Sequence, residues 1–383
     1  MTNIKEYNLL DVRKNSKIIS CLKEVYKLWG YEEVSPSTIN NIETIKASEV
    51  INQKELIGLS TNRNLCLRPE MTTSIIKLIS TRLINKKRPL RLWNSGTTFE
   101  RREGYKNSEK LKEKIHSGIE LIGYNTEFPE IEIINLLFDA IDKFELKKDS
   151  KLVFLVSSTT LMDLILKTHM ADNYEIIKKC MINMDQDSIN KLEIKNSDKL
   201  VLKDLLFTRG EPFTIINKLE KLYGEHKTLE DLSYLFQIIC PIAKNNGIEV
   251  QLDPTFQPHL NLYAGIVFQL ICIKDNKKLV IAKGGRYDEL VRYFNPKEKV
   301  PTGLGFSISI DNIRKLIKDD PDKNNKVLIA YKIKSKLAKA IIYQKELHAQ
   351  GITAILEINP CVDNQQADYL MKVNNCSNII WID

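Results

Sequence analysis

The sequence lacks the groupings of residues that mark metal, redox and secreted proteins. Its seven cysteines lie at least 15 residues apart, are odd in number and form no CxxC pair, which argues against a disulfide framework or a thiolate zinc site. The five histidines are equally scattered. No apolar run approaches the roughly 20 residues of a membrane helix, and the first residues contain no apolar signal core. We therefore expect a cytoplasmic chain that needs no metal or other cofactor and no membrane.

The common catalytic motifs are also missing. The chain has no GxxxxGK[ST] loop, no GxGxxG after a strand, no GxSxG elbow and no HExxH. These absences argue against phosphate-loop enzymes, dinucleotide-dependent enzymes, α/β-hydrolases and zinc proteases. The net charge of +8 is compatible with nucleic-acid binding, but the lysines are spread thinly and the densest basic cluster is only residues 86–88. That distribution favours a solvated surface over an RNA-binding groove.

What is present is the composition and length of a globular protein with more than one folding unit. The 383 residues are 43% hydrophobic and 28% charged. Hydrophobic periodicity predicts an antiparallel sheet flanked by helices over residues 1–320, with a helical insertion at about 160–245. A polar linker at 318–325 precedes a strand–helix–strand–helix–strand pattern over residues 326–383. The predicted fold class is α+β, with a small α/β domain at the C-terminal end.

Local patterns fix several elements of the first domain. Helical spacing predicts a helix over 17–28, and a second helix over 74–84 that follows a strand. Thr72 or Thr73 is the candidate cap of that second helix. Strand-like runs at 90–99 and 115–124 enclose a polar segment, which predicts an antiparallel pair with a long connection.

Ionisable residues interrupt these apolar strands. Arg68 and Glu70 lie in the strand before the second helix, Glu120 lies in the 115–124 run, and Arg286 follows two glycines. An ionisable group is costly to bury without a partner. Each residue by itself fits a salt bridge or a solvent-facing position, but together they favour a polar ligand pocket on a sheet surface.

Seven short segments then occur in an order that resembles the histidyl-tRNA synthetase family of class II synthetases. They are GYEEVSP (30–36), LRPEMT (67–72), RLWNSGTTF (91–99), GIELIG (118–123), YAGIVF (263–268), GGRYD (284–288) and GLGF (303–306). The resemblance covers residues 1 to about 320 and implies a class II synthetase-like sheet. Residues 326–383 are similar to the start of that family's anticodon-binding domain, which implies a truncated form of that domain.

The positions that activate the amino acid in that family are altered here. The resemblance implies an ATP-binding arginine where this chain has Glu100, a nucleotide-clamping arginine where it has Asn312, and a histidine-activating arginine where it has Pro258. Adenylate formation depends on pre-placed cations, and losing one such donor costs about 10²–10³ in rate. Three replacements predict a chain that does not activate an amino acid.

The amino-acid pocket of the family is better retained. The resemblance implies that Glu70 and Thr72 hold the ammonium of a bound histidine, while Glu120 and Tyr263 face its imidazole. Carboxylates attract an ammonium, and an acceptor beside a phenol orients an imidazole ring. His116 replaces a family glutamine beside this pocket. An alternative remains open, in which Glu70 and Glu120 belong to a polar network that only stabilises the sheet.

This combination is similar to one branch of the family, the regulatory subunits of ATP phosphoribosyltransferase. The resemblance implies a non-catalytic chain that assembles, four plus four, with a short-form catalytic subunit and is needed for activity and feedback inhibition by histidine. It also implies a homodimer formed through residues 17–36. The alternatives are an active histidyl-tRNA synthetase and a catalytically dead, synthetase-like RNA-binding protein. The altered activation residues oppose the first, and the diffuse charge and short C-terminal domain oppose the second.

Overall fold

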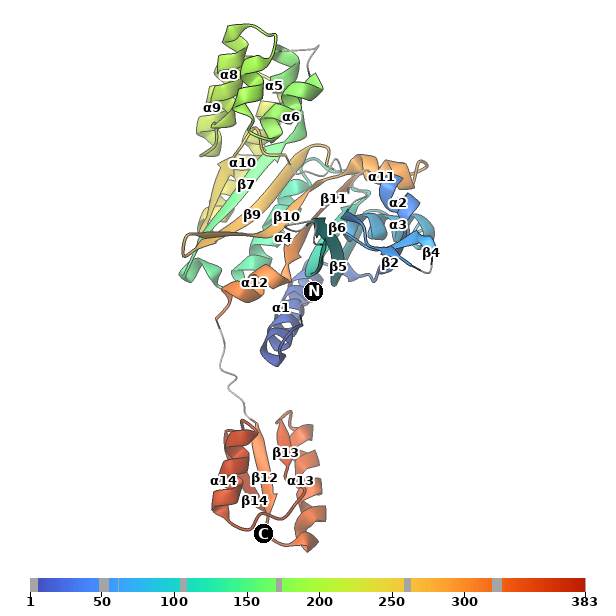
Figure 1. Cartoon of the computed structure of the whole chain (residues 1–383), viewed down its shortest axis with the longest axis vertical. Helices are drawn as coiled ribbons and strands as arrows, with labels where there is room; N and C mark the ends of the chain where they lie inside the picture. Colours follow the sequence, from blue (N-terminus) through green and yellow to red (C-terminus); the bar gives the residue numbers. More distant parts are fainter. Residues whose placement is uncertain are drawn as a thin grey trace. The chain divides into compact units, whose positions relative to one another are not determined.

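The computed structural model describes residues 6–47, 55–60, 62–103, 109–169, 174–257, 263–318 and 326–382. The chain divides into two compact units, Met1–Ile317 and Lys318–Asp383, which are described separately below (Figure 1). Within the described ranges, no helix is both long enough and apolar enough to cross a bilayer.

An eight-stranded sheet organises the first unit, in the order β1-β5-β6-β11-β10-β9-β7-β8. Its strands are β1 (Glu32–Glu33), β5 (Leu90–Glu103), β6 (Glu109–Ile122), β7 (Lys151–Ser158), β8 (Ile248–Leu252), β9 (Ile266–Lys274), β10 (Lys277–Arg286) and β11 (Gly303–Ser309). All neighbours are antiparallel except the β1–β5 and β7–β8 pairs at the two edges. The predicted α+β class, with a mainly antiparallel sheet, is confirmed.

Helices cover both faces of this sheet at its β5–β6–β11 end (Figure 1). Their bounds are α1 (Leu9–Leu28), α3 (Thr72–Arg82), α4 (Glu130–Asp142), α11 (Asp288–Phe294) and α12 (Ile310–Leu316). Helix α1 contacts α4 and α12, while α3 contacts α11. A small sheet of β2 (Ile39–Asn41), β4 (Asn62–Leu67) and β3 (Gly58–Leu59) lies beside α2 (Ile42–Ala47) and leads into α3.

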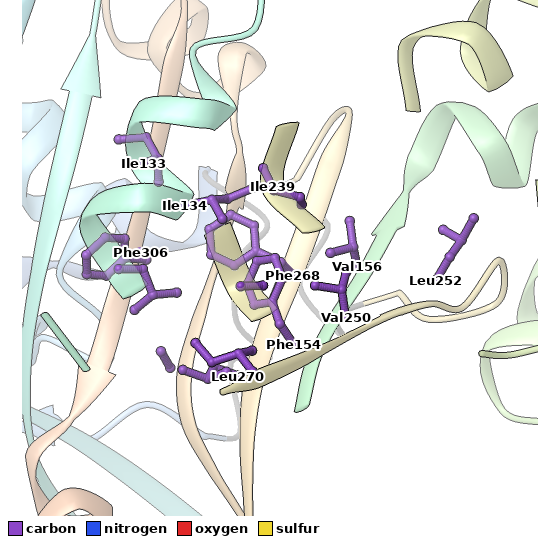
Figure 2. Packing of buried hydrophobic residues seen from close by; sticks show 14 of the residues in the cluster. Ile133, Ile134, Phe154, Val156, Ile239, Val250, Leu252, Phe268, Leu270 and Phe306 are labelled. Atoms are coloured by element: carbon purple, nitrogen blue, oxygen red, sulfur yellow. The ribbon is translucent and has the colours of Figure 1, made fainter. Parts of the chain in front are cut away.

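The main core lies between α4 and the sheet, where Ile133 and Ile134 point towards aromatic side chains of the strands (Figure 2). Phe154 is central to this core, because its ring centroid lies 5.0 Å from that of Phe138 and 5.3 Å from that of Phe268. Burying one such side chain contributes roughly 1.5–3 kcal/mol. The core therefore holds the sheet rigid beneath the site described below.

Residues between β7 and β8 form a group of helices beside the sheet. They are α5 (Thr159–His169), α6 (Tyr174–Ile182), α7 (Gln186–Lys191), α8 (Asn196–Leu206), α9 (Pro212–Tyr223) and α10 (Lys227–Asn245). A short 3-10 helix, η3 (Leu146–Lys148), precedes β7. Helix α10 contacts α4 and β8, so these helices share the core of the first unit.

The second unit contains a three-stranded parallel sheet in the order β13-β12-β14. Its elements are β12 (Val327–Tyr331), η4 (Lys334–Lys336), α13 (Leu337–Ala349), β13 (Ala354–Leu356), α14 (Asn364–Val373) and β14 (Asn378–Ile382). The order strand, helix, strand, helix, strand agrees with the sequence pattern.

Three local predictions were wrong. Helix α1 begins at Leu9 rather than at residue 17, because Asn8 caps it by accepting a hydrogen bond of 2.8 Å from the Asp11 N–H. Helix α3 begins at Thr72, so neither Thr72 nor Thr73 is its cap. The polar segment 100–114 is mostly strand, since β5 and β6 remain paired out to Glu103 and Glu109.

Candidate functional site

A cavity of about 830 Å³ opens on the face of the sheet opposite α1 and α4. Its floor comes from β5, β6, β10 and β11, and its wall comes from the Leu67–Thr72 segment and Tyr263. Strand alternation explains the floor, since residues at i, i+2 and i+4 of a strand share a face. On β6 these are His116, Gly118 and Glu120. The structure thus brings together Glu70, Thr72, His116, Glu120, Tyr263 and Asn312, all of which line this cavity.

Glu120 is held by two hydroxyl groups. Thr72 Oγ1 donates to Glu120 Oε1 across 2.9 Å, and the hydroxyl of Tyr287 donates to Glu120 Oε2. Only 6% of Glu120 is exposed. Burial raises the pKa of its carboxyl to about 8, and the two hydrogen bonds only partly oppose this shift.

Glu70 lies at the start of α3, on the same cavity wall. Both its carboxylate oxygens accept from the Thr73 N–H, at 3.0 and 3.1 Å, so Glu70 takes the capping role that had been predicted for a threonine. Burial raises the pKa of Glu70, and its hydrogen bonds to Thr73 and Thr72 lower it. Glu70 in turn raises the pKa of Glu120 by like-charge repulsion. Burial is nevertheless the larger cause of the raised pKa of Glu120.

Two glycines make room for the side chains of Glu120 and Tyr263. A Cβ on Gly305 would overlap the Glu120 carboxylate and the Ile119 carbonyl oxygen. A Cβ on Gly285 would lie 2.7 Å from the ring of Tyr263. Tyr263 lines the cavity, and burial together with the charges of Glu120 and Glu70 raises the pKa of its hydroxyl. Gly285 of the GGRYD segment and Gly305 of the GLGF segment are therefore glycines because any side chain there would overlap its neighbours.

His116 lines the cavity as a neutral side chain. Its Nδ1 lies 3.3 Å from Ser307 Oγ. Burial, followed by the positive charge of Lys114, lowers the pKa of its imidazole to about 4. A neutral imidazole offers one N–H donor and one acceptor but no charge near pH 7.

The former activation positions carry no cation in the described part of the chain. Asn312 donates from Nδ2 to the Val280 carbonyl across 2.9 Å, next to the irregularity in β10, and accepts from Lys315. Glu100, on β5, forms a salt bridge with Lys114, which itself lines the cavity. Pro258 lies outside the described residues.

Arg68 and Arg286 do not line the cavity, so the prediction that they share a pocket with Glu70 and Glu120 was wrong. Arg68 donates to the backbone carbonyls of Thr97 and Pro36, each at 2.8 Å. Arg286 donates to Asp288 across 2.8 Å. Arg68 thus holds the backbone beside the cavity, and it also acts electrostatically on Glu70. Arg286 is held by carboxylates outside the cavity, Asp288 and Glu130.

Sequence reasoning missed Tyr287, which lies 167 residues from its partner Glu120. The available signal was its place directly after Arg286, in a segment whose glycines border the cavity. It also missed Lys283 and Asp311, which line the end of the cavity near Lys114 and Asn312. The cavity therefore has a carboxylate-rich part at α3 and a lysine-containing part at β10 and α12.

This arrangement suits a small cationic ligand. Within the described ranges neither Glu70 nor Glu120 forms a salt bridge, and their hydrogen-bond donors there are hydroxyl and backbone groups. The same ranges contain no cluster of three or more His, Cys, Asp or Glu side chains that would hold a metal ion. An ammonium or imidazole group that enters the cavity meets two carboxyl groups and the phenol of Tyr263.

Comparison with known proteins gives one consistent family. The sequence profile of histidyl-tRNA synthetase matches residues 3–313. The chain is 58% identical over 382 residues to an ATP phosphoribosyltransferase regulatory subunit of Prochlorococcus marinus subsp. pastoris, covering 100% of both chains. It is 33% identical to the protein of that name from Synechococcus sp., covering 100% of this chain and 98% of the relative.

Solved structures agree on the fold. A Bacillus halodurans protein described as an ATP phosphoribosyltransferase regulatory subunit/histidyl-tRNA synthetase superposes with a TM-score of 0.82 at 21% identity, covering 99% of this chain and 97% of that one. A histidyl-tRNA synthetase from Nostoc sp. superposes with a TM-score of 0.79 at 14% identity, covering 99% and 90%. The predicted class II synthetase-like fold is confirmed. The chain belongs to the histidyl-tRNA synthetase family and, within it, to the ATP phosphoribosyltransferase regulatory subunits.

Proposed function

We propose that this chain is the non-catalytic subunit of a two-component ATP phosphoribosyltransferase. A short-form catalytic subunit needs it for activity and for feedback inhibition by histidine, in a cytoplasmic assembly of four catalytic and four regulatory chains. The names of the relatives support the regulatory role. Asn312 and the Glu100–Lys114 salt bridge support the lack of amino-acid activation, because neither position offers a free cation to a triphosphate.

The cavity binds histidine as the effector. The observation that carries this proposal is that Glu70 and Glu120 line the same cavity and form no salt bridge within the described ranges. Thr72 and Tyr263 border the same space. A charge-assisted hydrogen bond contributes about 1.5–3 kcal/mol, so two carboxyl groups suffice for specific binding of an ammonium and an imidazole.

The chain also forms a homodimer through α1 and the segment that follows it to Pro36. Support comes from exposed apolar side chains on α1, including Leu9 at 80% and Leu28 at 85% exposure. In a two-fold dimer both protomers contribute the same surface patch. The interface therefore buries each of these leucines in both protomers.

Mixing this chain with a short-form catalytic subunit tests the regulatory role. We expect phosphoribosyltransferase activity to rise on mixing, and histidine to inhibit only the mixture. The purified chain by itself should give neither phosphoribosyl transfer nor histidine-dependent pyrophosphate exchange, and it should not charge tRNA. A histidyl-tRNA synthetase serves as the positive control for exchange. Turnover by the chain alone would contradict the proposal.

A further inference from the structure

Strand β14 is the longest uncharged edge strand of the described sheets. It lies at one end of the sheet in the second unit, and its residues Asn378–Ile382 include four large apolar side chains and no charge. The other edges of the described sheets are at most three residues long or contain a glutamate, such as Glu249 on β8. Folded proteins usually protect an edge by shortness, charge or a covering segment, because a free edge pairs with other chains.

The pairing with β12 determines which backbone groups of β14 point outwards. The Ser377 N–H donates to the Lys326 carbonyl across 2.8 Å, so residue 377 faces β12. The N–H and C=O of one residue point to the same side of a strand, and the side alternates from residue to residue. The backbone groups of Asn378, Ile380 and Ile382 therefore point away from β12. Within residues 326–382, β14 pairs with no other strand.

The opposite edge of this sheet is covered by side chains. The Thr353 carbonyl accepts from the Val327 N–H of β12, so by the same alternation the Ala354 carbonyl of β13 points outwards. Two side chains of α13 donate to that oxygen, Gln344 Nε2 across 3.0 Å and His348 Nε2 across 3.1 Å. In the described part of the chain no such bond reaches the outward groups of β14.

The outward groups of β14 fit a second β14 that runs antiparallel to it. With the two-fold axis at Ile380, this residue faces its own copy, and Asn378 faces the partner's Ile382. All three outward residues then exchange backbone hydrogen bonds, and the Cα atoms of the two facing Ile380 residues lie about 5.5 Å apart. Between them, Ile379 faces the partner's Trp381, an aromatic–β-branched pair of the kind that stabilises sheets. Because β14 has no charge, its pairing with itself brings no like charges together.

We propose that β14 pairs antiparallel with β14 of a second copy of this chain, which joins the sheets of two second units into one sheet of six strands. The contact rests on the proposed homodimer. Two chains held together through α1 keep their second units at a raised effective concentration. A small contact can then form without changing the mass of the dimer.

Residue-resolved amide hydrogen exchange of the full-length wild-type chain tests this pairing. The inward amides of Ile379 and Trp381 are protected by β12 in any case. The outward amide of Ile380 should exchange at least about tenfold more slowly than in Leu28→Glu, measured at a concentration where that variant is monomeric. The outward amide of Leu356 on β13 is the internal control and should exchange equally in both chains. Equal rates at Ile380 in the two chains would overturn the contact.

A second variant, Ile380→Lys, places two lysines opposite each other at the two-fold axis. We expect the outward amides of residues 378 and 382 to exchange faster, while those of Ile379 and Trp381 stay protected because the second unit is still folded. Ile355→Lys on β13 is the matched control, since it changes a half-buried isoleucine of the other edge and should leave Ile380 protected. Neither variant should change the mass of the dimer. Unchanged exchange at 378 and 382 in Ile380→Lys would overturn the contact.

The outcomes separate this contact from the proposed function. A dimeric wild-type chain whose Ile380 amide exchanges freely would overturn the contact but leave the homodimer intact. A monomeric wild-type chain would overturn both. Protection of Ile380 that arises only after the catalytic subunit is added would overturn the contact as well, because a strand of the other protein would then occupy the edge.

Discussion

Thr72 Oγ1 lies 2.9 Å from Glu120 Oε1 and donates a hydrogen bond to it, although 48 residues separate them in the chain. This bond joins the first residue of α3 to the C-terminal part of β6. Thr72 had been expected beside Glu70, as a partner for the ammonium of a ligand. The structure adds a second role, since the same hydroxyl orients the carboxyl group of Glu120 in the proposed pocket.

Replacing Gly305 by alanine should displace Glu120. A Cβ at this position would overlap the Glu120 carboxylate and the Ile119 carbonyl oxygen. Neither the strand nor the hydrogen-bonded Glu120 side chain can shift freely. We expect Gly305→Ala to weaken histidine binding by at least about tenfold, as measured by calorimetry. Gly58→Ala is the control, since the nearest atom to a Cβ there is 3.9 Å away. Unchanged affinity in Gly305→Ala would show that Glu120 does not contact the ligand.

The stability of the chain should depend on pH through His116. The pKa of this imidazole is about 4 in the folded chain and about 6.5 when unfolded, so the unfolded state binds more protons between these values. Stability should therefore fall as the pH drops from about 6.5 to about 4, by an amount on the order of 2–3 kcal/mol. His116→Gln should remove this part of the pH dependence in denaturant unfolding curves. If the stability of the variant and that of the wild type changed with pH in the same way, His116 would be solvated and this prediction would be wrong.

Arg314 should be a major source of stability at the junction of α1 and α12. Its guanidinium donates to Asn15 across 2.6 Å and to Asp311 across 2.9 Å, and it lies 3.2 Å from Asp11. Only 5% of Arg314 is exposed. Arg314→Met leaves the buried carboxylate of Asp311 without its guanidinium partner and should lower the free energy of unfolding by about 3–5 kcal/mol.

The exposed ion pair of Arg292 and Glu289, at 3.4 Å, provides the control for this prediction. Arg292→Met should cost less than about 1 kcal/mol. Denaturant titration of both variants makes the comparison. Equal losses of stability would mean that the buried network contributes no more than a surface ion pair.

The homodimer should depend on α1. Light scattering of the wild-type chain at micromolar concentration is expected to give the mass of a dimer. Because the interface is two-fold, Leu28→Glu would place one negative charge on each protomer's side of it. This should shift the equilibrium towards the monomer. Leu200→Glu on α8, where the leucine is 66% exposed, is a matched control that should leave the mass unchanged. A wild-type monomer, or a Leu28→Glu dimer of undiminished stability, would contradict an interface at this helix.

The sequence predicted the site better where residues share one strand or one short segment. The period of two along β6 places His116 and Glu120 on the same face, and the family motifs point to Glu70 and Tyr263. Tyr287 was missed because its contact with Glu120 depends on the register of β10, β11 and β6, which local patterns do not contain. Arg68 was misassigned because its partners are backbone carbonyls, which leave no signal in a side-chain pattern.

The ends of elements were harder to predict than their existence. Asn8 caps α1 two residues after the first described residue, ahead of any strong apolar periodicity, so the first two turns of that helix were missed. The β9–β10 hairpin turns at Asp275 and Asn276, two residue types that tolerate the positive φ angles of 49° and 57° found there.

Histidine inhibition of the assembled enzyme carrying Glu120→Gln tests the central claim most directly. The concentration of histidine for half-inhibition, referred to the uninhibited activity of the same preparation, should rise roughly 10- to 150-fold, because one charge-assisted contact of about 1.5–3 kcal/mol is lost. Melting temperature measured on the same sample separates this from a purely structural role. A lower melting temperature with an unchanged inhibition curve would contradict a histidine site at Glu120.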